Sequence, residues 1–404
     1  MRNLRNIAIA AVLIFAMVAM TGCTTFNNFK AAFFEETGLK SDTIKIGVLE
    51  PQTGNDSKMG NEEIRGIELA HKLKPNVLDK DVELIFEDTQ SSIYVTETAV
   101  TDLIAKAPAV VLGSYGDTVT LIASQMLGEA KIPAIAITST NPLITVNNPY
   151  YFRVSFTDAS QGKVLADYVV EKLKLKKAAV IRMDRDDTTV ELVSKFKSRM
   201  RHLTGTESSV PLTIDVKVDT KDYTEMLEQI RDSEVKAVFM PVNLTVAQAI
   251  MEQADKLEMT DITFIGPKDW HGDEMLLFAK KHPNLSISVA SDFVSTVEDE
   301  ENKENQDVET TSVYEEFVEA YQAEYTGAEP TEAAALAFDA YMIAVNAIEK
   351  NGKIEAESLK DAIGKTEYSG ASGKITFDDT GEPKKPINVD IVKDGKYVSV
   401  FTKK

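Results

Sequence analysis

Cysteine is nearly absent from the 404-residue chain, since Cys23 is the only one. A single thiol excludes an intramolecular disulfide, a cysteine-ligated zinc site and a CxxC redox pair. Histidine is also scarce, and none of the four shows a spacing typical of metal ligands: His71, His202, His271 and His282. We therefore expect neither a disulfide nor a metal site.

The nucleotide and nucleophile motifs of alternating β/α enzymes are absent too. The turn after the first expected strand, "EPQTGNDSKMG", lacks the GxGxxG spacing that admits a pyrophosphate. Neither a GxxxxGK[ST] phosphate loop nor a GxSxG nucleophile motif occurs. We therefore expect no bound cofactor, and the residues do not support an enzyme.

Positive charge is in deficit, with 44 lysines and arginines against 64 acidic residues and a net charge of -20. Such a balance excludes nucleic acid as an expected partner, because phosphates would be repelled. Together with 43% hydrophobic residues, it fits an extracytoplasmic protein with two cores of ordinary size. The acidic run from Val297 to Glu309 is predicted to be a solvated loop near a hinge.

The N-terminal apolar run, Ile7 to Met20, is shorter than the roughly 20 residues that span a bilayer. Arg2 and Arg5 precede it and small residues follow it, as in a secretory signal peptide. We expect residues 1–22 to be this signal and residues 23–43 to be a tether that precedes the folded body.

The sequence Met20-Thr21-Gly22-Cys23 resembles a bacterial lipobox. The resemblance implies that Cys23 is lipidated on its thiol and becomes the new N-terminus. Two or more acyl chains hold a protein stably at a membrane, so this would be a firm anchor on the outer or periplasmic face of the cell membrane. An ordinary signal peptide with a chance cysteine is the alternative.

From Ile44 onward, short runs rich in valine and isoleucine alternate with helix-length segments, which is typical of parallel sheets covered by helices. The first set of expected strands comprises Ile44–Leu49, Val82–Phe86, Ala109–Leu112 and Ala134–Thr138. The second set comprises Ala178–Arg182, Leu212–Val218, Ala237–Met240, Ile262–Gly266 and Ile287–Ser291. Two sets exceed what one sheet comfortably holds, so we predict two α/β lobes.

Three loops follow expected strands at the position where open α/β sheets hold ligands. They are "GSYGDT" from Gly113 to Thr118, "ITSTNP" from Ile137 to Pro142, and "IGPKDWHG" from Ile265 to Gly272.

These loops, in this order behind a lipobox, resemble the branched-chain amino acid binding protein family, the type I periplasmic binding proteins of ABC transporters. The likeness is carried by "IKIGVLEPQTG", "IPAIAITSTNP", "YYFRVSFTDASQGKVLADYVVEKL" and "FIGPKDW". It implies two Rossmann-like lobes with parallel sheets, joined by a hinge that the chain crosses three times. The lobes would be residues 44–158 plus 292–359, and residues 159–291 plus 360–404.

The resemblance also implies a function. An amino acid or related small solute would bind in a cleft between the lobes, and the closed, loaded protein would dock on ABC permease subunits. We expect a monomer that is not an enzyme. A ligand-sensing or partner-binding lipoprotein on the same fold is the alternative, because fold alone does not separate the two.

Within the cleft, the resemblance assigns ligand contacts to the hydroxyl and N–H of Thr140 and to the carbonyl of Thr138, with Ser139 between them. An alternative for Thr140 is that it only caps the turn before Pro142. Met59 and Asn243 stand at an aromatic and a tyrosine position of the family. Trp270, the only tryptophan, is predicted either to line the cleft or to pack at the lobe surface.

Two departures concern charge. Asp117, beside Thr118, stands where the family has a carboxylate-binding serine, and Lys268, beside Asp269, stands where it has an acidic partner for the ammonium. A desolvated carboxylate facing a ligand carboxylate is unfavourable without a cation, so a plain leucine, valine or isoleucine is not favoured. Asp117 would then hold a cation and Lys268 an anion. Alternatively, Asp117 is a helix N-cap and Lys268 a rim residue.

Overall fold

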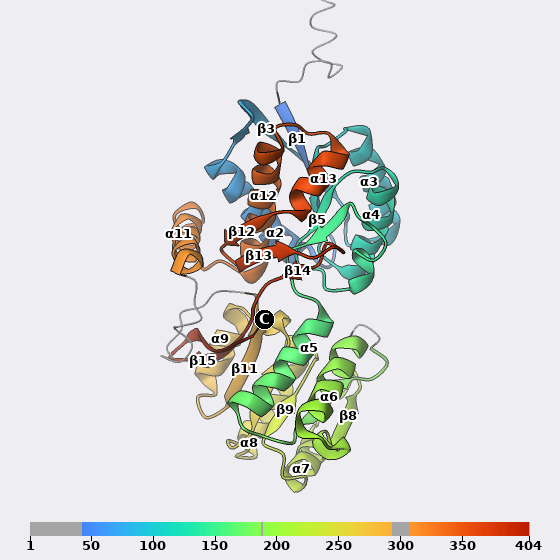
Figure 1. The fold of residues 1–404 in the computed structure, drawn as a ribbon. Coiled ribbons are helices and arrows are strands. Elements are labelled where there is room, and N and C mark those ends of the chain that lie inside the picture. Colours follow the sequence, from blue (N-terminus) through green and yellow to red (C-terminus); the bar gives the residue numbers. More distant parts are fainter. Residues whose placement is uncertain (1–42, 187–188, 293–307, 404) are drawn as a thin grey trace, which may run out of the picture.

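The computed structural model describes residues 43–186, 189–292 and 308–403, which form two α/β lobes joined by connecting segments (Figure 1). The predicted two-lobe α/β architecture is confirmed. The lipobox, the tether and most of the acidic run lie outside the described residues. Within the described part, no helix is both long enough and apolar enough to cross a membrane.

The first lobe is built on a six-stranded sheet in the order β2-β3-β1-β4-β5-β6, parallel except for the short antiparallel β2. Its strands are β1 (Thr43–Glu50), β2 (Asn76–Val77), β3 (Lys80–Asp88), β4 (Val110–Gly113), β5 (Ala134–Ala136) and β6 (Tyr151–Arg153). Alternate residues of β1 enter different cores, because Ile44, Ile46 and Val48 pack with one helix layer and Leu49 with the other.

Helices cover both faces of this sheet (Figure 1). One layer contains α2 (Ser57–Leu73), α11 (Val308–Glu324), α12 (Glu332–Asn351) and α13 (Ala356–Gly364). The other contains α3 (Ile93–Ala105), α4 (Asp117–Glu129) and the 3-10 turn η1 (Pro142–Ile144). Helices α2 and α12 pack closely at Gly66 of α2, where an added Cβ would lie 2.0 Å from the Ala334 carbonyl oxygen of α12.

The second lobe has a seven-stranded sheet in the order β16-β15-β11-β10-β9-β7-β8. Its strands are β7 (Ala179–Met183), β8 (Leu212–Val216), β9 (Ala237–Phe239), β10 (Thr263–Gly266), β11 (Ser286–Ser291), β15 (Ile387–Lys393) and β16 (Lys396–Lys403). The strands β15 and β16 are antiparallel and close one edge.

Two helix layers also cover this second sheet. The first contains α5 (Asp158–Asp167), its π-helical continuation η2 (Tyr168–Lys172) and α6 (Val190–Thr204). The second contains α7 (Thr224–Asp232), α8 (Leu244–Lys256), α9 (Asp273–Lys281) and the 3-10 turn η4 (Lys268–Trp270). A further 3-10 turn, η3 (Glu207–Ser209), precedes β8.

A third, antiparallel sheet corrects the predicted lobe boundary. It consists of β12 (Glu367–Gly370), β13 (Gly373–Phe377) and β14 (Pro383–Lys384). Ile375 and Phe377 pack in the core of the first lobe, where the Phe377 ring lies 5.3 Å from that of Phe152. Residues 360–384 therefore belong with the first lobe rather than the second, because their apolar side chains are buried there.

The chain passes between the lobes after β6, after β11 and after β14, which brings three connecting segments together as a hinge. Because both main sheets are parallel around their central strands, the loops after β4, β5 and β10 leave the carboxyl ends of their strands and lie between the lobes.

Candidate functional site

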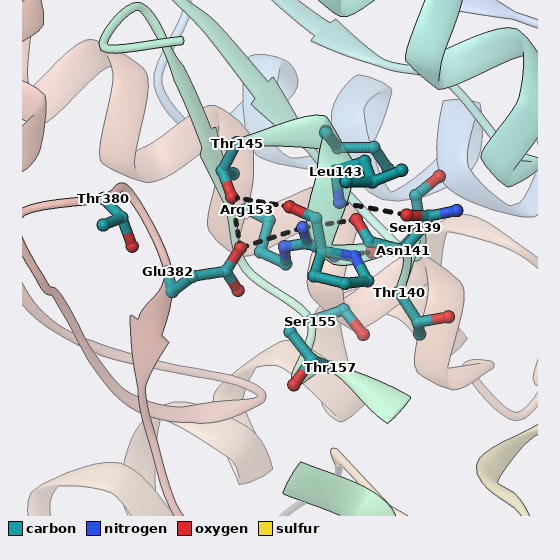
Figure 2. A network of polar contacts seen from close by, with 12 residues as sticks. Ser139, Thr140, Asn141, Leu143, Thr145, Arg153, Ser155, Thr157, Thr380 and Glu382 are labelled. Carbon is teal, nitrogen blue, oxygen red and sulfur yellow. Dashed lines mark hydrogen bonds and ion pairs between the residues drawn. The ribbon is translucent and has the colours of Figure 1, made fainter. Parts of the chain in front are cut away.

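The loop after β5, residues 137–142, is held from behind by a fully buried arginine. Arg153 donates to the carbonyl oxygen of Ser139 at 3.1 Å and to that of Asn141 at 2.6 Å, and pairs with Glu382 at 2.9 Å (Figure 2). Burial lowers the pKa of Arg153, while Glu382 and Asp117 oppose this effect. The arginine thus fixes two carbonyl groups of the loop.

Asp117 bonds to this loop from the first turn of α4. Its Oδ1 accepts hydrogen bonds from the N–H of Thr140 at 2.9 Å and from the N–H of Asn141 at 3.3 Å. The N-cap of α4 is Gly116, and no side chain caps that helix. The alternative that Asp117 is a helix N-cap is therefore wrong. Its carboxylate bonds the β5 loop instead.

Lys268, in the loop after β10, reaches from the second lobe to the first. Its ammonium donates to the carbonyl of Thr138 at 3.0 Å and to the hydroxyl of Ser155, and lies 3.6 Å from the carboxylate of Asp292. The side chain is only 7% exposed. Burial would lower the pKa of Lys268, but the neighbouring carboxylates outweigh it and the pKa is raised. Lys268 is therefore not a rim residue.

Asp292 joins the segments of the hinge around this lysine. Its carboxylate lies 2.8 Å from the ammonium of Lys385 and accepts a hydrogen bond of 3.1 Å from Ser155. Its N–H donates to Glu332 of α12 at 3.0 Å. Burial raises the pKa of Asp292, but Lys385 and Lys268 outweigh it and hold the pKa below its usual range. All three chain crossings thus contribute to one buried ionic network.

The charge of Asp117 also acts on two further acids, Asp158 and Asp269. Burial raises the pKa of Asp158 to about 7, and the charges of Asp269 and Asp117 add to this effect. Solvent reaches the Asp269 side chain, yet the protein atoms around it desolvate its carboxyl and raise its pKa. Lys268 opposes this rise and Asp117 adds to it. The half-buried Tyr115 has its pKa raised by burial and then by Asp269, which places its hydroxyl among these acids.

A second carboxyl pair lies behind the β5 loop. Glu63 of α2 accepts a hydrogen bond from the Thr138 hydroxyl, and Glu50 accepts one of 2.9 Å from the N–H of Tyr115. Both glutamates are fully buried. Burial raises the pKa of Glu63 to about 7, partly offset by hydrogen bonds from Glu50 and Thr138. Glu50 titrates well above its usual pKa, first because of burial and then because of Glu63.

The two-lobe α/β fold agrees with the comparison to known proteins. The sequence model described as a periplasmic binding protein matches residues 43–396. The chain belongs to the periplasmic binding protein family.

Relatives of this periplasmic binding protein are distant. An amino acid binding protein of Pseudomonas aeruginosa is 28% identical over 201 residues, so the match spans about half of each chain, 48% of this one and 53% of the relative. The Leu/Ile/Val-binding protein homolog 1 of Brucella abortus is 24% identical over 88% of this chain and 92% of its own. The crystal structure of the leucine binding protein LivK from Thermotoga maritima superposes with a TM-score of 0.73 at 27% identity, covering 89% of this chain and 98% of that one.

The predicted residues of this periplasmic binding protein fall into two groups. The structure brings Asp117, Thr138, Thr140, Lys268 and Asp269 together between the lobes. Whether they contact a solute stays a prediction.

The remaining predicted residues have local roles or face elsewhere. Trp270 is fully buried in the core of the second lobe, its indole N–H donating to the Val242 carbonyl at 2.8 Å, so packing rather than ligand contact describes it. Asn243 caps α8 by accepting from the N–H of Val246. Ser139 is buried, 2.8 Å from the hydroxyl of Thr120. Met59 is half-buried and Thr118 exposed, each in the first turn of a helix.

Sequence reasoning missed three residues of this region. Tyr115 lies in the loop "GSYGDT", and Arg153 and Asp158 lie in the segment that begins "YYFRVSFTD". A signal for Arg153 was available, since a charged residue inside the apolar run "YYFRVSF" must find partners when that strand is buried. Tyr115 and Asp158 carried no such signal, because polar residues at strand ends are ordinary in loops.

Proposed function

We propose that this protein is the solute-binding component of an ABC importer, which captures an amino acid or related small polar solute between its lobes and delivers it to a permease. The observation that supports this most is the meeting of charged side chains from both lobes at the hinge, with Lys268 of one lobe on the Thr138 carbonyl of the other. Relative motion of the lobes would therefore change contacts in the solute site itself.

The proposal includes lipidation of Cys23, which would keep the protein at the membrane beside its permease. Mass spectrometry of the N-terminal peptide checks this part. A Cys23→Ala variant is expected to leave the membrane fraction; retention there with an unmodified peptide would count against the anchor.

The solute-binding function is tested by the melting temperature of the purified chain from residue 40 onward. The panel contains amino acids, amides, polyamines, short carboxylates, purines and neutral sugars. A solute that binds only the native state raises the free energy of unfolding by RT ln(1 + [L]/Kd), and the melting temperature rises with it. A shift with one class, together with loss of uptake of that solute from cells lacking the protein, is the expected result.

A second candidate function has one observation in its favour. The N–H of Thr140 and the carbonyl of Thr138 are bonded to the protein's own charged side chains. A ligand-sensing or partner-binding lipoprotein with a repurposed site would show this feature. In that case, no solute in the panel would shift the melting temperature, and uptake would be unchanged without the protein.

A further inference from the structure

The β5 loop, residues 137–142, offers few free polar groups to a solute. Both N–H groups that face Asp117, those of Thr140 and Asn141, donate to its carboxylate. The hydroxyl of Thr140 interacts with the carboxyl of Asp158. The donors that would best hold a carboxylate are therefore already bonded to a carboxylate of the protein.

The other half of this loop is occupied in the same way by charged groups of the protein. The carbonyl of Thr138 accepts from the ammonium of Lys268, and the hydroxyl of Thr138 donates to Glu63. The Thr138 end of the loop is thus bonded to Lys268 and Glu63, and the Thr140 end to Asp117.

Positive charge is not available to a solute in this place. Lys268 is the only lysine or arginine in the loops after β4, β5 and β10, and it is bonded to Thr138, Ser155 and Asp292. Arg153 lies fully buried behind the β5 loop. An anionic solute would find no unbonded cation among the described residues of these loops.

Negative charge, by contrast, gathers around Asp117. Lys268 is the cation that acts on these acids, and its ammonium is already bonded to the Thr138 carbonyl and paired with Asp292. Asp117 raises the pKa of both Asp158 and Asp269, and Asp269 also raises that of Asp158, so these carboxyl groups repel one another. A solute carboxylate brought among them would add a further negative charge to this cluster of acids. An ammonium would relieve the same repulsion.

We propose that Asp117 sets the specificity of the inter-lobe site by acting as a built-in carboxylate, so that the site rejects carboxylate-bearing solutes, free α-amino acids included, and takes amine cations that lack a carboxylate. This proposal rests on the solute-binding function proposed above. Asp117 acts in two ways, because it occupies the N–H donors of Thr140 and Asn141 and it supplies charge. Lys268 contributes by keeping its own charge bonded within the protein.

The test uses pairs of compounds that differ only by the α-carboxylate: leucine and 3-methylbutylamine, lysine and cadaverine, arginine and agmatine. Binding to the full mature protein is measured by calorimetry and by the shift in melting temperature. At least one amine is expected to bind about tenfold or more tightly than its amino acid, because like charges at a binding site cost much affinity. An amino acid that binds as tightly as its amine would overturn the proposal and leave the solute-binding function standing.

Three variants separate the two actions of Asp117. Asp117→Ser frees both N–H donors and removes the charge, and it is expected to gain about tenfold or more in affinity for an amino acid. Asp117→Asn keeps an acceptor for those donors but removes the charge, so amine binding weakens while amino acids stay excluded. Asp102→Asn makes the same change on the exposed face of α3 and should alter neither affinity.

Folding of each variant is checked by its own melting temperature without solute, and Asp117→Asn covers the case in which Asp117→Ser does not fold. Failure of every compound to bind wild type, with no gain of amino-acid binding in the folded variants, would also overturn the proposal. The solute-binding function would then be decided separately, by the neutral members of the panel above.

Discussion

At the residue scale, the inter-lobe site is organised by charged side chains buried in unlike surroundings. Arg153 tolerates full burial because two carbonyls and Glu382 bond its two terminal nitrogens. Glu63 has no cation in direct contact, so its environment favours the neutral carboxyl instead. Desolvation thus acts on both groups, but Arg153 stays charged because it has partners, whereas Glu63 favours its protonated form.

This difference predicts a pH dependence for Glu63. Its pKa rises from 4.5 to about 7 on folding, so the folded state binds a proton that the unfolded state loses between those values. The contribution to stability is full below pH 4.5 and is lost as the pH rises through about 7. Glu63→Gln should remove this pH-dependent contribution. The difference in the free energy of unfolding between low and high pH should then shrink by on the order of 2 kcal/mol.

Urea unfolding at pH 5 and pH 8 measures that difference. Glu68→Gln, on an exposed turn of the same helix, is the matched control and should keep the wild-type pH profile. A Glu63→Gln protein with an unchanged profile would mean that Glu63 ionises normally in the folded chain.

At the element scale, most of the fold could be predicted from sequence, including the strand Lys374–Phe377 of the third sheet, but the lobe to which that sheet belongs could not. Each of the nine expected strands is present, because buried parallel strands leave short valine and isoleucine runs that periodicity detects. The strands β12 to β14 are short, pair only with one another, and include Pro383, so nothing local showed which lobe they join. Their burial against Phe152 is a tertiary fact.

The contacts of the site show the same limit. The sequence placed Asp117 and Lys268 in loops that face one another, because strand ends predict where loops gather. It did not reveal that Asp117 bonds the N–H of Thr140, or that Lys268 bonds the carbonyl of Thr138, since those pairs are 23 and 130 residues apart. The sequence also does not decide between a cleft position and a packed position for Trp270, because its partner Val242 is distant along the chain.

The contact between α2 and α12 supplies a prediction at this scale. A Cβ on Gly66 would lie 2.0 Å from the Ala334 carbonyl oxygen, and backbone on both sides leaves no flexible side chain to move aside. Gly66→Ala should therefore force the two helices apart and destabilise the protein by about 1 to 3 kcal/mol, despite the better helix propensity of alanine. Chemical unfolding measures the loss, with Glu68→Ala as the exposed control. Equal stability of the two variants would contradict this packing.

At the scale of the whole molecule, the hinge network determines how the lobes are held. Ser155, Asp292 and Lys385 lie on the three chain crossings, and all are buried. Asp292 contacts the other two directly, and Lys268 extends this network into a loop of the second lobe. Separating the lobes at this loop would leave the Lys268 ammonium without the Thr138 carbonyl, in a place where burial makes an unpaired charge costly.

Replacement of Lys268 by methionine therefore tests how the lobes are held. Lys268→Met keeps an unbranched side chain of similar length and leaves Asp292 paired with Lys385, so the hinge retains one ion pair. It removes the ammonium that joins the loop after β10 to the first lobe. Without solute, the variant is expected to have a larger radius of gyration in solution, measured by small-angle X-ray scattering. Separating its lobes no longer breaks the bond between Lys268 and Thr138, so the open arrangement becomes more populated.

The matched control is Lys256→Met. Lys256 is an exposed lysine of α8 that pairs with Glu252 one turn away, and the scattering of this variant should match wild type. If Lys268→Met scatters like wild type as well, the bond to Thr138 does not hold the lobes together. Closure would then rest on the hinge segments alone, where Asp292 pairs with Lys385.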